Sequence, residues 1–184
     1  VHGGARIGGN ALAELFVFGR RAGGAAAATA AGAIAALSET EEHEAVDAER
    51  SRFAAVLKRS DGPRPGELRS RLQNIMWRHV SVIRSRMGLE KALSAIAALQ
   101  KELPDMRAAS SSRVFNLDLM AALELENMAQ LAGIIAQAAL MREESRAGHF
   151  REDFPERSRE WDCNILVDRG ADGPSFSWKT AAAA

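Results

Sequence analysis

The sequence predicts a mainly α-helical protein: an antiparallel three-helix bundle followed by a short C-terminal β-hairpin. Three segments between residues 65 and 147 carry apolar residues at three- and four-residue steps, which is the spacing of one helix face. Only short links separate these segments, and short links favour antiparallel neighbours. Beyond them, two runs of strand-forming residues flank a glycine-containing turn.

The composition bounds the class of protein. An apolar fraction of 47% in 184 residues can form one core, and 24 basic residues balance 24 acidic ones. No net charge attracts nucleic acid or an anionic membrane, so neither is expected as a partner. The single cysteine, Cys163, excludes an internal disulfide framework and a cysteine-based zinc or iron-sulfur site. Residues 22–37 are mostly Ala and Gly and fall short of a membrane span, so we expect a cytoplasmic protein without one.

The N-terminal third contains one helix and a connector. Asn10 is a good N-cap for a first helix that carries Leu12, Leu15 and Phe16 at helical spacing. Residues 39–60 have an acidic front and a basic rear with little apolar content, which indicates a solvated helix or a mobile connector.

Each bundle helix has its own start and stop signals. The second helix begins with Pro65 at its first position and is predicted to end at Gly88. The third ends at Pro104, and the fourth is capped by Asn116 and runs to about Arg146. The residues expected to face inward from the fourth helix are Met120, Leu123, Met128, Leu131, Ile135 and Ala138.

The tail is an irregular arm followed by the hairpin, whose strands are NILVD and PSFSWK around RGADG. Charged residues at the start of the arm are predicted to form exposed ion pairs that hold it to the bundle. They are Glu143, Glu144, Arg146, Arg151, Glu152 and Asp153. His149 lies among them, but no two-His helical spacing supports a metal site.

A glycine-rich loop with one arginine, Arg6, precedes the first helix. Such a loop exposes main-chain N–H groups at the positive end of the helix dipole, where an anion or an electron-rich carbonyl can bind. A guanidinium adds a fork that matches a carboxylate. Glycine clusters before helices are common, however, and no strand precedes this one, so it is not a dinucleotide fingerprint.

Three segments in order resemble the succinate dehydrogenase and fumarate reductase flavoprotein family, which also includes L-aspartate oxidase. The first is HGGARIGGNALAELFVFGRRAG, the second IMWRHVSVIRSRMGLEKAL, and the third LELENMAQLAGIIAQAALMREESRAGHFREDFPER. The resemblance covers nearly the whole chain and is weakest over residues 38–63. It implies that the first loop and helix are the end of an FAD-binding domain.

The resemblance also implies roles for individual residues. Arg6 corresponds to the arginine that grips a carboxylate of the dicarboxylate substrate. Asn10, Ala11 and Leu12 correspond to the positions that contact FAD, mainly through main-chain atoms, with the helix N-terminus facing the flavin N1 and C2 carbonyl. Two residues depart from the family pattern, since Ala5 replaces the usual Asn and Ala11 the usual Ser.

The family's other site residues, its dinucleotide-binding half and its capping domain are expected upstream of this chain. We therefore expect residues 1–37 to be the end of the FAD-binding domain, 38–64 a connector, 65–147 the helical bundle, and 148–184 the arm and hairpin. The chain by itself has no catalytic residue and is expected to be inactive. In the complete flavoprotein, hydride transfer would interconvert succinate and fumarate. The candidate partner is an iron-sulfur subunit, and the inner membrane face is an alternative location.

Two alternatives remain open. An L-aspartate oxidase would share the family, and the residues that select its substrate lie outside this chain. A stand-alone helical interaction module would instead use Leu12, Phe16 and the Ala-rich helix as a docking face.

Overall fold

The computed structural model describes residues 10–32, 38–171 and 173–180. The chain divides into two compact units, Val1–Arg50 and Ser51–Ala184, and each is described by itself. In the first unit, α1 spans Asn10–Ala30 and buries none of its residues. The helix α2, Glu39–Lys58, begins there and ends in the second unit. The helix α1 begins at Asn10 itself, one residue earlier than the predicted cap implies.

A capping box starts α2. The Glu41 main-chain N–H donates to the Ser38 hydroxyl (3.3 Å), and the Ser38 N–H donates to the Glu41 carboxylate (2.8 Å). Glu39, Glu41 and Glu42 place negative charge at the positive end of the helix dipole. Of the two structures considered for this segment, the chain therefore forms the solvated helix.

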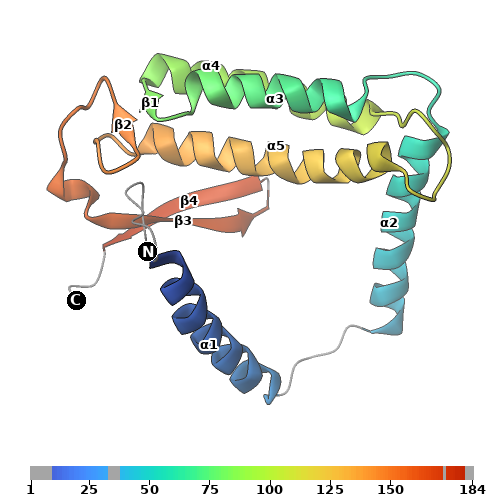
Figure 1. The fold of residues 1–184 in the computed structure, drawn as a ribbon, viewed down its shortest axis with the longest axis horizontal. Coiled ribbons are helices and arrows are strands. Elements are labelled where there is room, and N and C mark those ends of the chain that lie inside the picture. The colour runs from blue at the N-terminus through green and yellow to red at the C-terminus, as the bar shows by residue number, and fades with distance from the viewer. Residues whose placement is uncertain (1–9, 33–37, 172, 181–184) are drawn as a thin grey trace. The chain divides into compact units, whose positions relative to one another are not determined.

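The bundle consists of α3 (Pro65–His79), α4 (Arg86–Glu102) and α5 (Leu117–Met141), with a short 3₁₀ turn η1 at Leu103–Asp105. The three helices lie side by side, consecutive helices run in opposite directions, and each packs against the other two (Figure 1). The predicted antiparallel bundle is confirmed. Its core residues are Val56, Leu68, Leu72, Val80, Leu89, Ala92, Ile96, Leu99, Leu103, Met106, Ala108, Ala122, Leu125, Ala129, Ala132, Ala136 and Ala139.

The predicted boundary between the second and third helices was wrong. α3 ends at His79, and α4 begins at Arg86, so Gly88 lies in the first turn of α4 instead of breaking a helix. The reason is a cap that glycine spacing does not reveal. The Ser85 hydroxyl accepts a hydrogen bond from the Gly88 N–H (3.3 Å), which starts a new helix before the glycine.

The predicted inward face of α5 was also wrong. Met120, Leu131 and Ile135 are 55%, 56% and 48% exposed. The buried face consists of Leu125 and five alanines, Ala122, Ala129, Ala132, Ala136 and Ala139. Small alanine side chains allow α5 to approach α3 and α4 closely, so this face packs although the larger residues lie elsewhere. The helix also ends at Met141, before Arg146, because Arg142 has extended backbone angles (φ −78°, ψ 99°).

By length and composition, α5 is the one helix of the described residues that could cross a membrane. Length and composition are weak evidence, because the core helix of a bundle passes the same test. Here the alanine face of α5 lies in the bundle core.

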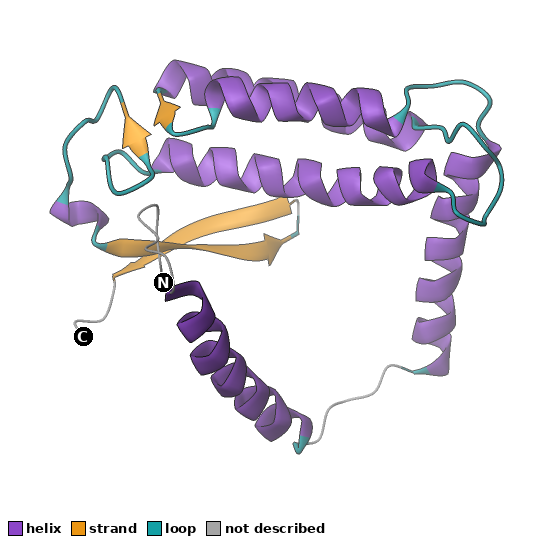
Figure 2. Cartoon of the chain, viewed as in Figure 1, coloured by secondary structure: helices purple, strands orange, loops and turns teal. Residues whose placement is uncertain are grey.

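The arm and the hairpin complete the second unit (Figure 2). The two-residue strands β1 (Ile83–Arg84) and β2 (Phe150–Arg151) pair in parallel and join the arm to the end of α3. After a 3₁₀ turn, η2 (Arg159–Trp161), the strands β3 (Cys163–Gly170) and β4 (Gly173–Thr180) form an antiparallel hairpin. The predicted hairpin is confirmed, with strands longer than expected.

Candidate functional site

The residues predicted to contact substrate and flavin lie at the N-terminal end of the chain. Arg6 is outside the described residues. Asn10, Ala11 and Leu12 form the first turn of α1, where Asn10 and Leu12 are exposed and Ala11 is partly exposed. The sequence did not miss this element, but the contacts of these residues with a ligand stay a prediction.

The first turn of α1 suits an anion or a flavin carbonyl. It contains no acidic residue that would offset the positive end of the helix dipole. The main-chain N–H groups of a first helical turn have no acceptor within their own helix. An electron-rich group placed at this end would therefore find donors and a favourable field, which is the requirement for holding the N1 and C2 carbonyl region of a flavin.

A second polar centre lies in the arm, around the fully buried Glu144. Its carboxylate accepts hydrogen bonds from Arg142 (2.7 Å), from Arg146 (2.7 and 3.1 Å) and from the Ser158 N–H (2.9 Å). Burial alone raises the pKa of Glu144, but the hydrogen bonds from these three partners outweigh burial and lower it. Arg146 also binds Asp162 (2.7 Å), so Glu144 is held ionised between two guanidinium groups that continue into the arm.

Arg151 closes the C-terminal end of α5. Its side chain is fully buried, and one guanidinium nitrogen donates to the main-chain oxygens of Ala139 (2.9 Å), Leu140 (3.0 Å) and Arg142 (3.1 Å). These carbonyls have no partner inside the helix, because it ends there. Arg151 therefore acts as a cationic cap at the negative end of the α5 dipole.

His149 connects this cap to β1. Its Nδ1 lies 2.5 Å from an Arg84 guanidinium nitrogen, and its Nε2 lies 3.1 Å from the Arg142 main-chain oxygen. The arrangement fits a neutral imidazole whose Nε2–H donates to the carbonyl while Nδ1 accepts from Arg84. Burial lowers the pKa of His149, and the positive charges of Arg84, Arg151 and Arg142 lower it further. The side chain has a structural part to play here, with no second His beside it among the described residues.

The predicted ion-pair network exists, but two of its members are buried instead of exposed. Glu143 pairs with Arg86, as an exposed pair would. Glu152 enters only through its main-chain N–H, which donates to the Arg84 oxygen (2.8 Å). Sequence reasoning missed Arg142 and Asp162, because the turns of the arm bring them to the network and no helical spacing does.

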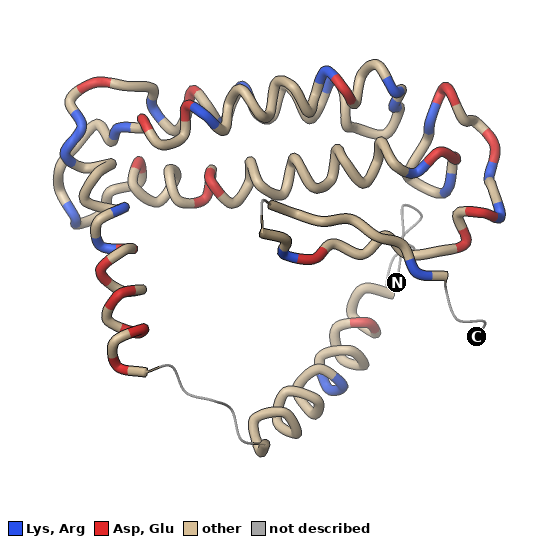
Figure 3. Tube along the Cα trace, turned by 180° about the vertical axis from the view of Figure 1, so that it is seen from behind, with Lys and Arg blue, Asp and Glu red and all other residues tan. Residues whose placement is uncertain are grey.

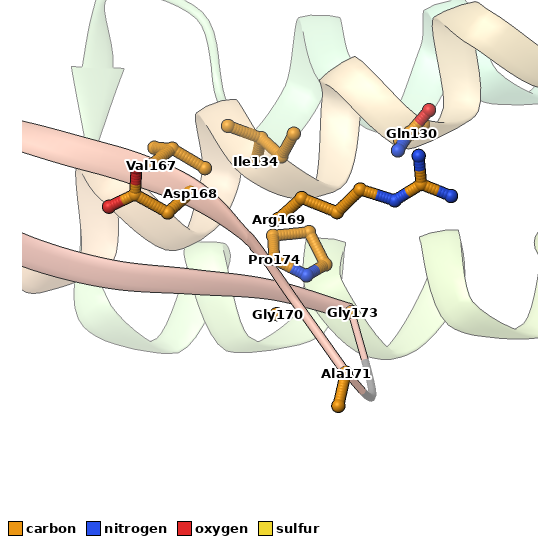
Figure 4. Close-up of a pocket in the computed structure, with 9 residues that line it drawn as sticks. All are labelled: Gln130, Ile134, Val167, Asp168, Arg169, Gly170, Ala171, Gly173 and Pro174. Carbon is orange, nitrogen blue, oxygen red and sulfur yellow. The ribbon is translucent and has the colours of Figure 1, made fainter. Parts of the chain in front are cut away.

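An open pocket of about 590 Å³ lies between α5 and the hairpin (Figure 4). Gln130 and Ile134 line it from α5, and Val167, Arg169 and Pro174 line it from the two strands. Within the part of the chain that the structure describes, no group of three or more His, Cys, Asp or Glu side chains is placed to hold a metal.

Residues 69–183 match the family described as "Fumarate reductase flavoprotein C-term". The chain belongs to the fumarate reductase and succinate dehydrogenase flavoprotein family. One of the subunits of the fumarate reductase (CoM/CoB) from Methanothermobacter marburgensis is 44% identical to it over 172 residues, which are 92% of this chain and 30% of that protein. An uncharacterized FAD-dependent oxidoreductase from Methanocaldococcus jannaschii is 36% identical over 91% of this chain and 29% of its own length.

The family fold is also evident in three dimensions. The FrdA chain of a quinol fumarate reductase variant from E. coli superimposes with a TM-score of 0.83 and 31% identity, covering 95% of this chain and 30% of that chain. This chain thus spans about 30% of the length of its flavoprotein relatives. The relative from Methanothermobacter marburgensis is named as one of several subunits, so members of the family work in multi-subunit enzymes.

Proposed function

We propose that this chain is the C-terminal part of an FAD-dependent flavoprotein subunit that interconverts succinate and fumarate. The observation that carries the proposal is the family run over residues 2–23, which leads into α1 at Asn10 with a first turn that is free of acidic side chains. Bound FAD would supply the acceptor or donor of the hydride.

The residues of this chain would bind and orient. Arg6 would hold one carboxylate of the dicarboxylate through a forked pair of hydrogen bonds. The first turn of α1, at Asn10, Ala11 and Leu12, would point its main-chain N–H groups at the flavin and favour the negative charge that reduction places there. A main-chain contact tolerates Ala11 in place of Ser, whereas Ala5 removes a side-chain amide from the loop.

We assign the regions of the chain on the same basis. Residues 1–37 would complete the FAD-binding domain, 38–64 would connect it to the bundle of 65–147, and 148–184 would add the arm and hairpin. The partners would be the FAD-binding and capping domains of the same polypeptide together with an iron-sulfur subunit. The flavoprotein would be cytoplasmic or peripheral on the inner membrane face through those partners.

The test uses the complete flavoprotein in its purified, flavin-loaded form. It should oxidise succinate and reduce fumarate, and Arg6→Lys should raise KM for the dicarboxylate about 10- to 100-fold while flavin content stays unchanged. Arg20→Lys, on α1 beyond the first turn, is the matched control and should leave KM unchanged. Oxidation of L-aspartate in preference to succinate would overturn the assigned substrate, and a folded protein without flavin would overturn the enzymatic function and favour the interaction module.

A further inference from the structure

The helix α5 is apolar on more sides than the bundle covers. Its alanine face is buried against α3 and α4, yet Leu131 and Ile135 on the other side are exposed. Residues 127–141, the C-terminal half of the helix, contain no charged residue. A helix that is apolar around its circumference is normally buried around its circumference. The outer side of this half therefore lacks the composition of a solvent face.

The other two bundle helices show what a solvent face looks like in this protein. Exposed positions of α3 carry Arg71 and Arg78, and those of α4 carry Glu90 and Lys91. In Figure 3 charged residues mark both of these helices, whereas the C-terminal half of α5 is free of them. The contrast within one bundle indicates that water covers α3 and α4 but not the outer side of α5.

The hairpin has two chemically different faces. Cross-strand pairing places Ile165 beside Trp178 and Val167 beside Phe176 on one face. The other face carries mostly polar residues, namely Asn164, Asp168, Ser175, Ser177 and Lys179, with Leu166 among them. A two-stranded hairpin is marginally stable by itself and needs a packing partner for its apolar face.

The apolar face of the hairpin borders the pocket that α5 closes on its other side. Val167 and Pro174 from the strands and Ile134 from α5 line it (Figure 4). The guanidinium of Arg169 extends along the pocket toward Gln130 (Figure 4). The pocket thus has two apolar walls and a cationic, hydrogen-bonding end.

We propose that an apolar segment from the remainder of the same flavoprotein polypeptide fills this pocket, with a carboxylate or carbonyl oxygen placed against Arg169. The inference rests on the proposed function, since relatives extend over about three times the length that this chain covers. A lipid tail fits less well, because it would leave Arg169 and Gln130 without acceptors or donors. A segment tethered in the same polypeptide also reaches the pocket at high effective concentration.

The hairpin offers a matched pair of test variants. Val167 and Leu166 are neighbours on β3 with nearly equal exposure, 40% and 41%, but they lie on opposite faces. In the 184-residue chain, Val167→Lys and Leu166→Lys should therefore shift the unfolding temperature by similar amounts. In the complete flavoprotein, Val167→Lys should lower that temperature by about 5 °C or more relative to Leu166→Lys, because it places an unpaired charge in a filled pocket.

Equal effects of the two variants in the complete flavoprotein would overturn the proposal. So would self-association of the 184-residue chain that Val167→Lys abolishes in sedimentation, since the occupant would then be a second copy. Binding of the chain to neutral phosphatidylcholine vesicles that the same variant abolishes would identify lipid instead. Succinate and fumarate turnover of the unmodified flavoprotein is measured separately, so that a failure of the proposed function is distinguished from a failure of the pocket assignment.

Discussion

Arg151 and Asp153 form a two-bond ion pair in which the arginine side chain is fully buried. Arg151 Nε donates to one carboxylate oxygen of Asp153 and Nη2 donates to the other, both at 2.8 Å. The pairing keeps the pKa of Asp153 well below its usual range. Because the same guanidinium also caps α5, one side chain joins the bundle helix, β2 and the arm.

Arg151→Met should lower the free energy of unfolding by about 3–5 kcal/mol. The substitution leaves the three carbonyls at the end of α5 without their donor and leaves Asp153 without its cation. Urea denaturation of the chain measures the change. Arg157→Met is the matched control, because Arg157 is exposed and its pair with Asp162 should contribute at most about 1 kcal/mol. Equal effects of the two variants would contradict the capping role.

Glu144 and Glu143 provide a second matched pair. Glu144→Gln removes a fully buried charge that two arginines share, and it should cost about 3 kcal/mol. Glu143→Gln changes only an exposed pair with Arg86 and should cost less than about 1 kcal/mol. Urea midpoints at pH 7 compare the two. A Glu144→Gln variant as stable as Glu143→Gln would show that the buried cluster is held by something other than its charge.

His149 should make stability depend on pH in the mildly acidic range. Its pKa in the folded chain is lowered, first by burial, whereas the unfolded chain titrates at about 6.5. Below pH 6.5 the unfolded state binds the proton more readily, so stability is full above pH 6.5 and falls as the pH decreases. Urea midpoints between pH 7 and pH 5 should show this slope.

His149→Gln is the control for this pH dependence. A glutamine amide can still donate and accept but does not titrate, so the slope between pH 6.5 and pH 5 should flatten in the variant. Below about pH 4.5 a second loss of stability should begin in both proteins, as Glu144 and Asp153, whose folded-state pKa values are also lowered, meet their unfolded values. An NMR titration that places the pKa of His149 at or above 6.5 would contradict the assignment.

Gly62 should not tolerate a side chain. Its φ is +119°, and an added Cβ would lie 2.1 Å from the Asp105 main-chain oxygen. Gly62→Ala should therefore cost about 2 kcal/mol or more. Gly66, in the first turn of α3, has nothing within 4 Å of an added Cβ, so Gly66→Ala should be neutral or stabilise by up to about 1 kcal/mol. Thermal unfolding of both variants checks the opposite signs.

Local signals in the sequence predict much of this fold, because caps and turns act over a few residues. Pro65 begins α3 as its position implies, and Asn116 caps α5 by accepting a hydrogen bond from the Leu119 N–H (3.0 Å). Longer-range packing is less accessible to such reasoning. Periodicity chose the larger residues of α5, such as Leu131, as its core, although close helix packing selects its alanines.

For the candidate site, the sequence predicts the element better than the contacts. The start of α1 at Asn10 follows from a local signal, while the ligand contacts of Asn10, Ala11 and Leu12 depend on groups outside this chain and stay predictions. The buried position of Arg151 illustrates the same limit. Its role as a helix cap requires the arm to turn back onto α5, and only tertiary structure specifies that turn.

The short ladder between β1 and β2 has a consequence for the order of folding. Its two main-chain bonds, from Phe150 N–H to the Val82 oxygen (3.3 Å) and from Glu152 N–H to the Arg84 oxygen (2.8 Å), join segments that have the whole of α4 and α5 between them. Closing so long a loop costs chain entropy that two hydrogen bonds recover only after the helices have packed. The ladder should therefore form after the transition state, so that changes at Phe150 speed unfolding and leave the folding rate nearly unchanged.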